Sequence, residues 1–189
     1  MKLLRYGPKG QEKPGIVDPD GIVRNLSDLV DDIGGDILTD QGLAVIAEAN
    51  LASLPAVEVD RYGPCVGKVG KFICIGLNYS DHAEESGLDV PPEPVIFAKA
   101  TSAICGANDT VELPRGSKAT DWEVELGVVI GKQAKYINEA EALDYIAGYC
   151  VINDISERDF QNKRAGQWTK GKSADTFGPI GPWLVTRDE

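Results

Sequence analysis

Two glutamates stand two positions apart in the stretch DWEVELGVVI, residues 121–130. In a β-strand alternate side chains share a face, so Glu123 and Glu125 would lie on one side with Gly127 and Val129. The other side would carry four apolar residues that favour burial: Val124, Leu126, Val128 and Ile130. Two carboxylates in partly dry surroundings repel each other, and at least one would be protonated unless a cation lay between them. The pattern predicts either a cation site or the solvated face of an edge strand.

A third carboxylate follows an apolar run in GYCVINDISERDFQ, residues 148–161. The run predicts a strand that ends at Asp154, and the spacing of Ser156 and Asp159 resembles a capping box at the start of a helix. If Asp154 converges on Glu123 and Glu125, the three form an all-oxygen site suited to Mg²⁺, Mn²⁺ or Ca²⁺. Zinc fits less well, because no His or Cys lies close to them in the sequence. Taken alone, Asp154 is more typical of an ordinary turn.

The single histidine lies in IGLNYSDHAEESGLD, residues 75–89. Asp81 can cap a helix of under two turns that ends at Gly87, and His82 and Glu85 would then share a face. A carboxylate beside an imidazole raises its basicity, which suits a general base that takes a proton from water. A lone surface histidine is the alternative reading. Glycines at 76 and 87 bracket this helix, so we hypothesise that it is a mobile lid.

The stretch GQWTKGKS, residues 166–173, matches the phosphate-binding pattern G-x-x-x-x-G-K-[ST]. That loop needs an apolar strand before its first glycine and a helix from its lysine. Here polar residues precede it, and glycines and prolines follow it, so we reject nucleotide binding. Lys172 is better interpreted as a fixed positive charge in a tight loop. Serine-hydrolase chemistry is also excluded, because the sequence has neither G-x-S-x-G nor a second histidine.

Composition restricts the partners of the protein. The 189 residues include 30 acidic and 19 basic side chains, and the net charge of -11 opposes binding to nucleic acid and anionic membranes. A small anionic substrate would therefore need local positive charge. Four cysteines without a CxxC pair, three of them among apolar neighbours, predict reduced core thiols and a cytoplasmic protein. No apolar run reaches the roughly 20 residues that a membrane span needs.

Hydrophobic alternation and turn residues predict an α+β protein that is mostly β. A small N-terminal α+β domain spans residues 1–65, and a catalytic domain with a curled mixed sheet spans residues 66–189, with the Gly- and Pro-rich RYGPCVGKVGKF between them. Helices are expected from Ser27 to Ile33 and from Thr39 or Asp40 onward. Strands are expected at residues 2–6, 15–18, 22–26, 71–76, 95–99, 123–130, 148–154 and 183–186.

Four pieces occur in a fixed order: GLNYSDHAEE, FAKA, DWEVELGVVIG, and NDISERDFQ followed by KGKSADTFGPIGP. Together they resemble the fumarylacetoacetate hydrolase family, in its branch of acylpyruvases, 2-hydroxyhepta-2,4-diene-1,7-dioate isomerases and 2,4-diketo-3-deoxy-sugar-acid hydrolases. The resemblance covers roughly residues 70–189. It implies a rolled mixed β-sheet, a homodimer and Mg²⁺ or Mn²⁺ as cofactor, with Ca²⁺ possible in crystals. Family members continue well beyond the position of Glu189, so the C-terminal part of the core is expected to be missing.

The resemblance also implies roles for individual residues. It places metal ligands at Glu123, Glu125 and Asp154, water activation at His82 and Glu85, a catalytic lysine at Lys172, and substrate contacts at Lys99, Arg158 and Gln161. The implied substrate is a small anionic 2,4-dioxo acid, either an acylpyruvate or a 2,4-diketo-3-deoxy sugar acid. Attack of water at C4 and cleavage of the C3–C4 bond would release a pyruvate enolate, stabilised by the metal and Lys172.

Other readings of the same site stay open at the level of sequence. An isomerase or decarboxylase of the 2-hydroxyhepta-2,4-diene-1,7-dioate type, or a ureidoglycolate lyase, could use the same metal. A metal-binding or assembly module without catalysis is the alternative outside enzymology.

Overall fold

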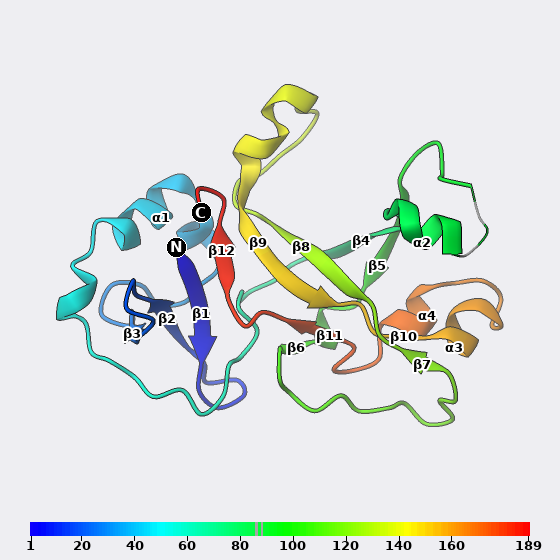
Figure 1. Ribbon diagram of the computed structural model, residues 1–189, viewed down its shortest axis with the longest axis horizontal. Coiled ribbons are helices and arrows are strands. Elements are labelled where there is room, and N and C mark those ends of the chain that lie inside the picture. The colour runs from blue at the N-terminus through cyan, green and yellow to red at the C-terminus, as the bar shows by residue number, and fades with distance from the viewer. Residues whose placement is uncertain (86, 88) are drawn as a thin grey trace.

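The computed structural model describes residues 1–85, 87 and 89–189 of the chain (Figure 1). Its N-terminal part begins with three antiparallel strands, β1 (Lys2–Tyr6), β2 (Lys13–Val17) and β3 (Val23–Asn25). The side chain of Asp18 accepts hydrogen bonds from the backbone N–H groups of Asp20 and Ile22, and so closes the turn at Pro19-Asp20-Gly21. The predicted hairpin is therefore confirmed.

The helices of this part follow a 3-10 turn. After η1 (Gly35–Leu38), α1 (Asp40–Ala47) begins where the hydroxyl of Thr39 accepts the N–H of Gly42, as the sequence predicted, and η2 (Leu51–Ser53) follows. The helix expected from Ser27 to Ile33 is wrong, because this segment forms only turns and bends. The side chain of Asn25 accepts both the backbone N–H and the hydroxyl of Ser27, and such local bonds compete with helix formation.

A single large sheet runs through the molecule in the order β3-β2-β1-β12-β9-β11-β6, with β8 on the free edge of β9. Its remaining strands are β6 (Ile104–Gly106), β8 (Val124–Ile130), β9 (Ile146–Asn153), β11 (Gly178–Ile180) and β12 (Leu184–Thr186). Among the described strands, only β11 and β6 pair in parallel. Strand β12 pairs with β1 on one edge and β9 on the other, so it joins the two parts of the chain. The domain boundary near residue 65 stays a prediction.

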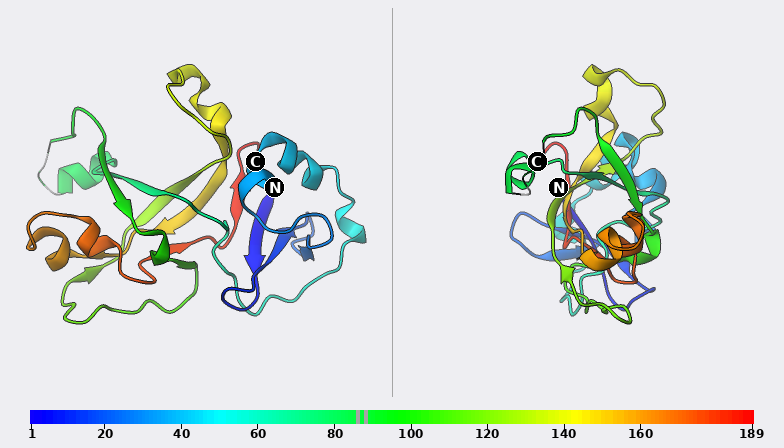
Figure 2. Two further views of the ribbon diagram at one scale, coloured as in Figure 1. Left: turned by 180° about the vertical axis from the view of Figure 1, so that it is seen from behind. Right: turned by 90° about the vertical axis from the view of Figure 1, so that its right-hand side faces the viewer.

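Two short ribbons and three short helices complete the part that faces away from α1 (Figures 1 and 2). The ribbons are β4 (Phe72–Gly76) with β5 (Val95–Lys99), and β7 (Thr120–Asp121) with β10 (Ser156–Glu157). The helices are α2 (Ser80–Glu85), α3 (Arg158–Asn162) and α4 (Thr169–Lys172), and the 3-10 helices are η3 (Thr101–Ala103) and η4 (Glu139–Tyr145). The predicted extension of α2 to Gly87 includes residue 86, which lies outside the described residues.

The start of α3 differs from the prediction in its cap. The N-cap is Glu157, whose carboxylate accepts the N–H of Asp159, whereas the hydroxyl of Ser156 donates to the carbonyl of Asp154. Lys172 lies in the one-turn helix α4 rather than in an irregular loop. All strands expected from the sequence are present within a few residues, and the α+β, mostly β fold class is confirmed.

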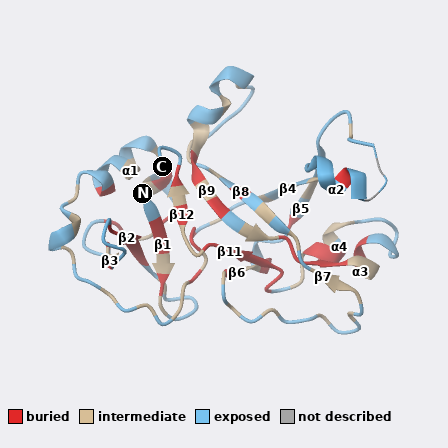
Figure 3. Ribbon diagram, in the orientation of Figure 1, coloured by how far each residue is buried: buried red, intermediate tan, exposed pale blue. Residues whose placement is uncertain are grey.

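Strand β8 reverses the expected burial of its two faces. Its apolar side is open, with 61% of Leu126 exposed, and Val151 of β9, the cross-strand partner of Leu126, is 57% exposed (Figure 3). The side that carries Glu125 and Gly127 faces inward. The main core instead lies around β1, β9, β12 and α1, and includes Leu3, Ile16, Ile46, Ala147, Cys150 and Leu184.

Two further predictions concern membrane-spanning helices and the state of the cysteines. Among the described residues, no helix combines the length and the apolar character that a membrane crossing needs. The four cysteines are free thiols, three buried and one half-buried. The cytoplasmic location stays a prediction.

Candidate active site

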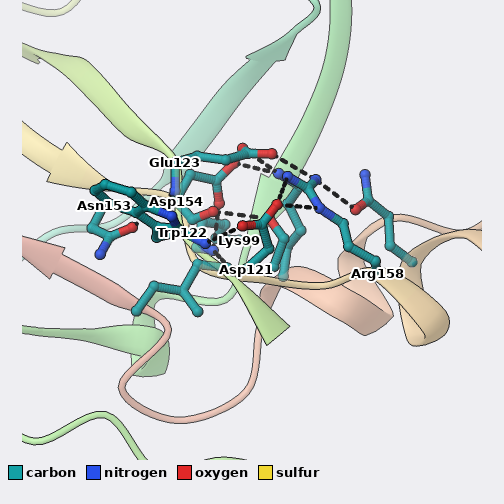
Figure 4. Close-up of polar contacts among 11 residues, drawn as sticks. Lys99, Asp121, Trp122, Glu123, Asn153, Asp154 and Arg158 are labelled. Atoms are coloured by element: carbon teal, nitrogen blue, oxygen red, sulfur yellow. Dashed lines mark hydrogen bonds and ion pairs between the residues drawn. The ribbon is translucent and has the colours of Figure 1, made fainter. Parts of the chain in front are cut away.

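The pairing of β8 with β9 brings three carboxylates together. Glu125 lies opposite Ile152, the backbone N–H of Asp154 donates to the carbonyl of Glu123 at 2.9 Å, and the side chain of Asn153 accepts the N–H of Glu123. Glu123, Glu125 and Asp154 each offer an oxygen, and these oxygens lie within 4.8 Å of one another. The structure therefore assembles the acidic centre that the sequence predicted; Figure 4 shows Glu123 and Asp154 side by side.

Two buried lysines donate hydrogen bonds to the carboxylates of this acidic centre. Lys99, the last residue of β5 and 2% exposed, donates to Asp154 Oδ1 at 2.5 Å and to the carbonyl of Ile155 at 3.1 Å. Lys172, at the end of α4 and 3% exposed, donates to Asp154 Oδ2 at 2.7 Å and to Glu123 Oε2 at 2.8 Å. Burial lowers the pKa of Lys99, and the charge of Asp154 opposes that shift. The pair ties β5 and α4 to the carboxylates.

Arg158 adds a third cation at the first residue of α3. Its guanidinium contacts Asp121 at 2.7 Å and Glu123 Oε1 at 2.6 Å, and it donates to Gln161 Oε1 at 3.2 Å (Figure 4). The hydrogen bond from Arg158 lowers the pKa of Asp121. Gln161 is buried beside it. Asp121 was missed by the sequence reasoning, although its position at the head of DWEVEL and its acidity were the available signal.

Glu125 is the one carboxylate of the three that forms no ion pair or hydrogen bond with the described part of the chain. Burial, followed by the charges of Asp154 and Glu123, raises the pKa of Glu125 to about 7. A half-buried carboxylate that repels two others is stabilised by a cation placed among them. Because every donor in the set is a carboxylate oxygen, the chemistry fits a hard divalent cation such as Mg²⁺ or Mn²⁺.

A cleft of about 570 Å³ opens over this centre. Its apolar wall includes Phe97 and Trp168, whose rings meet edge to face with centroids 5.4 Å apart, and the ammonium of Lys172 lies 5.1 Å from the Phe97 centroid. These aromatic residues were not predicted, because a single Phe or Trp in sequence is more typical of a core. The cleft is also lined by Glu123, Glu125, Asp154, Arg158, Gln161 and Lys172.

The predicted pair His82 and Glu85 is only partly assembled. His82 lies on α2, is exposed and lines the cleft. Glu85 is exposed on the same helix, and these two described side chains form no ion pair within 4.0 Å. The role of the pair in activating water stays a prediction, as does the movement of α2 as a lid.

A further buried carboxylate, Glu157, lies next to the site and caps the helix that begins at Arg158. Glu157, at the N-cap of α3 and 0% exposed, accepts hydrogen bonds from the hydroxyl of Ser117, the backbone N–H groups of Lys118 and Ala119, and the N–H of Asp159. Burial raises the pKa of Glu157, but these hydrogen bonds outweigh it and lower the pKa from 4.5 to about 2. Except for Asp159, these donors lie 38 to 40 positions earlier in the chain, so no local pattern could identify Glu157.

Comparison with known proteins identifies the family of the chain that carries this site. The family model for the fumarylacetoacetate (FAA) hydrolase C-terminal domain matches residues 71–189, which contain every residue of the acidic centre. The chain belongs to the fumarylacetoacetate hydrolase family. A Burkholderia multivorans family member that carries the general name of a hydrolase is 65% identical over 190 residues, covering all of this chain and 67% of its own length.

Solved structures of the fumarylacetoacetate hydrolase family share the fold. Fumarylacetoacetate hydrolase from the psychrophile Exiguobacterium antarcticum aligns with a TM-score of 0.79 at 30% identity, and 5-carboxymethyl-2-hydroxymuconate delta-isomerase from Mycobacterium smegmatis with 0.73 at 30%. They cover 100% and 99% of this chain, and each is matched over 67% of its own length. Maleylpyruvate hydrolase from Sphingobium sp. SYK-6, solved with manganese(II) and pyruvate, aligns with 0.77 at 26%, over 100% of this chain and 68% of its own.

Proposed function

We propose that this member of the fumarylacetoacetate hydrolase family is a hydrolase that uses Mg²⁺ or Mn²⁺ to cleave a carbon–carbon bond in a small 2,4-dioxo acid. The substrate would be an acylpyruvate or a 2,4-diketo-3-deoxy sugar acid. The observation that carries the proposal is the unpaired Glu125 beside Glu123 and Asp154, an all-oxygen donor set at the floor of a cleft. The solved maleylpyruvate hydrolase, which holds manganese and pyruvate on the same fold, supports it.

Glu123, Glu125 and Asp154 would hold the cation. When bound, the cation supplies Lewis-acid polarisation of the substrate carboxylate and 2-oxo oxygens. Lys99 and Lys172 keep Asp154 in place through one hydrogen bond to each of its oxygens. The centre is thus preorganised before substrate arrives, which limits the rearrangement needed during reaction.

Lys172 would stabilise negative charge as it develops on the substrate. An ammonium has three donor hydrogens, and two of them are used by Glu123 and Asp154. The third would be available to an oxygen of the substrate in the cleft, which Lys172 lines. Such a donor would stabilise the enolate oxygen that forms when the C3–C4 bond breaks.

His82 would accept the proton of the attacking water. It lines the cleft from α2, and Glu85, one turn along the same helix, would orient it after a side-chain rotation. We expect His82→Ala to leave Mn²⁺ affinity unchanged and to lower turnover by roughly 10²-fold to 10⁴-fold. Equal loss of metal binding and turnover would contradict the role of His82 as a base, and calorimetry beside a rate assay separates the two.

The lining of the cleft also bears on the substrate. Arg158 and Lys172 are each already paired with carboxylates, and no other lysine or arginine is among the described residues that line the cleft. A second substrate carboxylate would therefore lack an unpaired cation among these residues. This favours an oxo acid with a neutral tail over a 1,7-dioate.

An isomerase or decarboxylase of the dioate type is the second candidate, because the Mycobacterium smegmatis isomerase aligns almost as well as the hydrolases. Ureidoglycolate lyase chemistry could use the same cation. We further propose a homodimer in the cytoplasm, without nucleic acid or membrane partners; sedimentation analysis tests the dimer.

The deciding experiment is a substrate panel of acetylpyruvate, oxaloacetate, ureidoglycolate, a 2,4-diketo-3-deoxy sugar acid and a 2-hydroxydiene-1,7-dioate, each with Mg²⁺ or Mn²⁺. Pyruvate plus a second carboxylic acid, seen by proton NMR, supports the hydrolase. A shifted double bond without cleavage supports the isomerase. Glu123→Gln should abolish metal binding, whereas Glu139→Gln, an exposed glutamate in η4, is the matched control that should not. Full metal affinity in Glu123→Gln overturns the ligand assignment.

A further inference from the structure

The position of α2 matters because this short helix carries His82. The helix lies at the end of the molecule that faces away from α1, and it spans only six residues (Figure 1). Ala83, at 2% exposed, is the one buried side chain among its described residues. A helix of under two turns has little stability of its own, so neighbouring elements must hold it in place. The contacts at its start therefore decide where the imidazole of His82 lies.

Tyr79, the residue before α2, joins the helix to β8. Its carbonyl accepts the backbone N–H of Ala83 at 3.1 Å, and its hydroxyl accepts the backbone N–H of Leu126 at 3.2 Å. In the described part of the chain, the second bond is the only hydrogen bond between residues 77–85 and any other segment. Leu126 directly follows Glu125. A single residue thus connects α2 to the strand that carries two carboxylates of the acidic centre.

The backbone that leads into Tyr79 is tightly constrained. The indole of Trp168 packs against Gly76, the last residue of β4, where an added Cβ would lie 2.4 Å from its Cζ3 atom. Leu77 has a φ of 52°, in the left-handed region, which costs energy for any residue with a side chain. Such a conformation persists only where the surrounding structure holds it. With Gly76 fixed by Trp168 and Tyr79 bonded to β8, the direction in which the chain enters α2 is set.

We propose that Tyr79 is a positioning residue, whose hydroxyl keeps His82 over the cleft by bonding the start of α2 to β8. This inference rests on the proposed function, in which His82 takes the proton of the attacking water. His82 follows Tyr79 by three positions, less than one helical turn, so a fixed Tyr79 limits the movement of the imidazole. Tyr79 is not among the described residues that line the cleft, whereas His82 is. Tyr79 therefore acts through His82 and does not contact the substrate.

The exposure of this hydrogen bond separates positioning from general stabilisation. Tyr79 is 40% exposed and Leu126 is 61% exposed, so water can take the place of the hydroxyl when it is removed. The fold would then lose little stability, because the N–H of Leu126 stays hydrogen-bonded. A water molecule does not connect α2 to β8 through a covalent side chain, so the helix would lose its tether. The effect of losing the hydroxyl should therefore appear at His82 and not in the unfolding of the protein.

The first test compares Tyr79→Phe with wild type in the metal-free protein by NMR. His82 is the only histidine of the sequence, so its imidazole C–H signals are assigned without ambiguity. We expect these signals to shift and broaden in Tyr79→Phe, and hydrogen exchange at the amide of Leu126 to become about threefold to tenfold faster. Tyr136→Phe is the matched control that should change neither, because Tyr136 is 96% exposed. Unchanged His82 signals and unchanged exchange at Leu126 in Tyr79→Phe overturn the proposal.

The second test measures turnover of acetylpyruvate, or of another panel substrate that is cleaved faster, with Mn²⁺. Tyr79→Phe should lower kcat about threefold to tenfold, the value of one neutral hydrogen bond, and leave KM and Mn²⁺ affinity unchanged. Added to His82→Ala, the same change should have no further effect, because the residue through which it acts is gone. An equal loss in both backgrounds overturns the proposal. Wild-type turnover in His82→Ala, or no cleavage of any panel substrate, contradicts the proposed function instead, and the NMR comparison still decides whether Tyr79 holds His82.

Discussion

Glu157 and Glu125 are two inward-facing glutamates whose pKa values move in opposite directions. Glu157 is enclosed by donors from the segment Ser117–Ala119 and from Asp159, and its pKa falls to about 2. Glu125 forms no hydrogen bond or ion pair with the described residues, and burial together with the charges of Asp154 and Glu123 raises its pKa to about 7, against a smaller opposing effect of Lys172 and Lys99. Burial alone would raise both values, so the difference lies in what each carboxylate contacts.

If the proposed function holds, the contrast separates a structural carboxylate, Glu157, from a functional one, Glu125. Glu157 is satisfied by the chain itself, and its hydrogen bonds fix the start of α3 and thereby Arg158. Glu125 has no hydrogen-bond or ion-pair partner among the described residues, and the proposed function assigns that place to a bound cation. Perturbed titration without a protein partner is typical of a site that binds something. Removal of one carboxylate at a time tests this division.

The largest effect is expected for Asp154→Ala. Asp154 pairs with Lys99 and Lys172, both of which are buried, and its removal leaves Lys99 without a carboxylate partner. Breaking a buried pair by removing one partner costs about 3–5 kcal/mol. We expect the free energy of unfolding in urea to fall by that amount and metal binding to be lost.

Asp121→Ala is the matched control for Asp154→Ala. Asp121 also pairs with a cation, Arg158, but its side chain is 45% exposed, so the loss should stay below about 1 kcal/mol. Similar destabilisation by the two substitutions would show that burial does not determine the strength of these pairs.

The next effect is expected for Glu157→Gln. The amide keeps the shape of the side chain, but its NH₂ group would face the N–H groups of Lys118 and Ala119, so hydrogen bonds are lost. Leaving such buried groups unpaired costs about 1–3 kcal/mol. Urea unfolding at neutral pH measures it, and the exposed Glu112→Gln should change stability by less than about 0.5 kcal/mol.

The pH dependence of stability should also reveal the contribution of Glu157. Because the pKa of Glu157 is lowered from 4.5 to about 2 in the folded protein, its contribution to stability is present above pH 4.5 and is lost as the pH falls toward 2. Wild-type stability should therefore decline through this window, and Glu157→Gln should decline less steeply. Parallel pH profiles for the two proteins would refute the assignment. The Asp18, Asp109 and Asp121 pKa values are also lowered, so some slope remains in the variant.

Sequence patterns predicted the positions of the strands better than the burial of their faces. Alternation and turn residues located β8 and β9, and the spacing of Glu123 and Glu125 placed their side chains on one face. The pattern alone could not say which face of β8 is covered, because that depends on the pairing of β8 with β9 and on the order of the strands in the sheet. Burial of Val124 and Leu126 was expected for this reason and is not observed.

The site was predicted where its signal is local and missed where it is not. Glu123, Glu125 and Asp154 converge because two strands that pair place them there, and the family resemblance had named all three. Glu157 depends on backbone donors about forty positions earlier in the chain, a relation without a spacing rule. His82 and Glu85 satisfy the helical spacing but do not meet, because spacing fixes a shared face and leaves the rotamers free.

The smallest effect on stability, and the sharpest test of the division, is expected for Glu125→Gln. Glu125 forms no ion pair or hydrogen bond with the described residues, and the charges of Asp154 and Glu123 repel it. Replacing it with a neutral isostere should leave the metal-free protein within about 0.5 kcal/mol of wild type, or slightly more stable. Affinity for Mn²⁺ should nevertheless fall by more than about tenfold, because one of three donors loses its charge. Calorimetry after chelation measures the affinity, and urea unfolding measures the stability. A variant that is destabilised but keeps its affinity for Mn²⁺ would show that Glu125 is a structural carboxylate like Glu157. Loss of affinity without loss of stability is the result expected for a metal ligand.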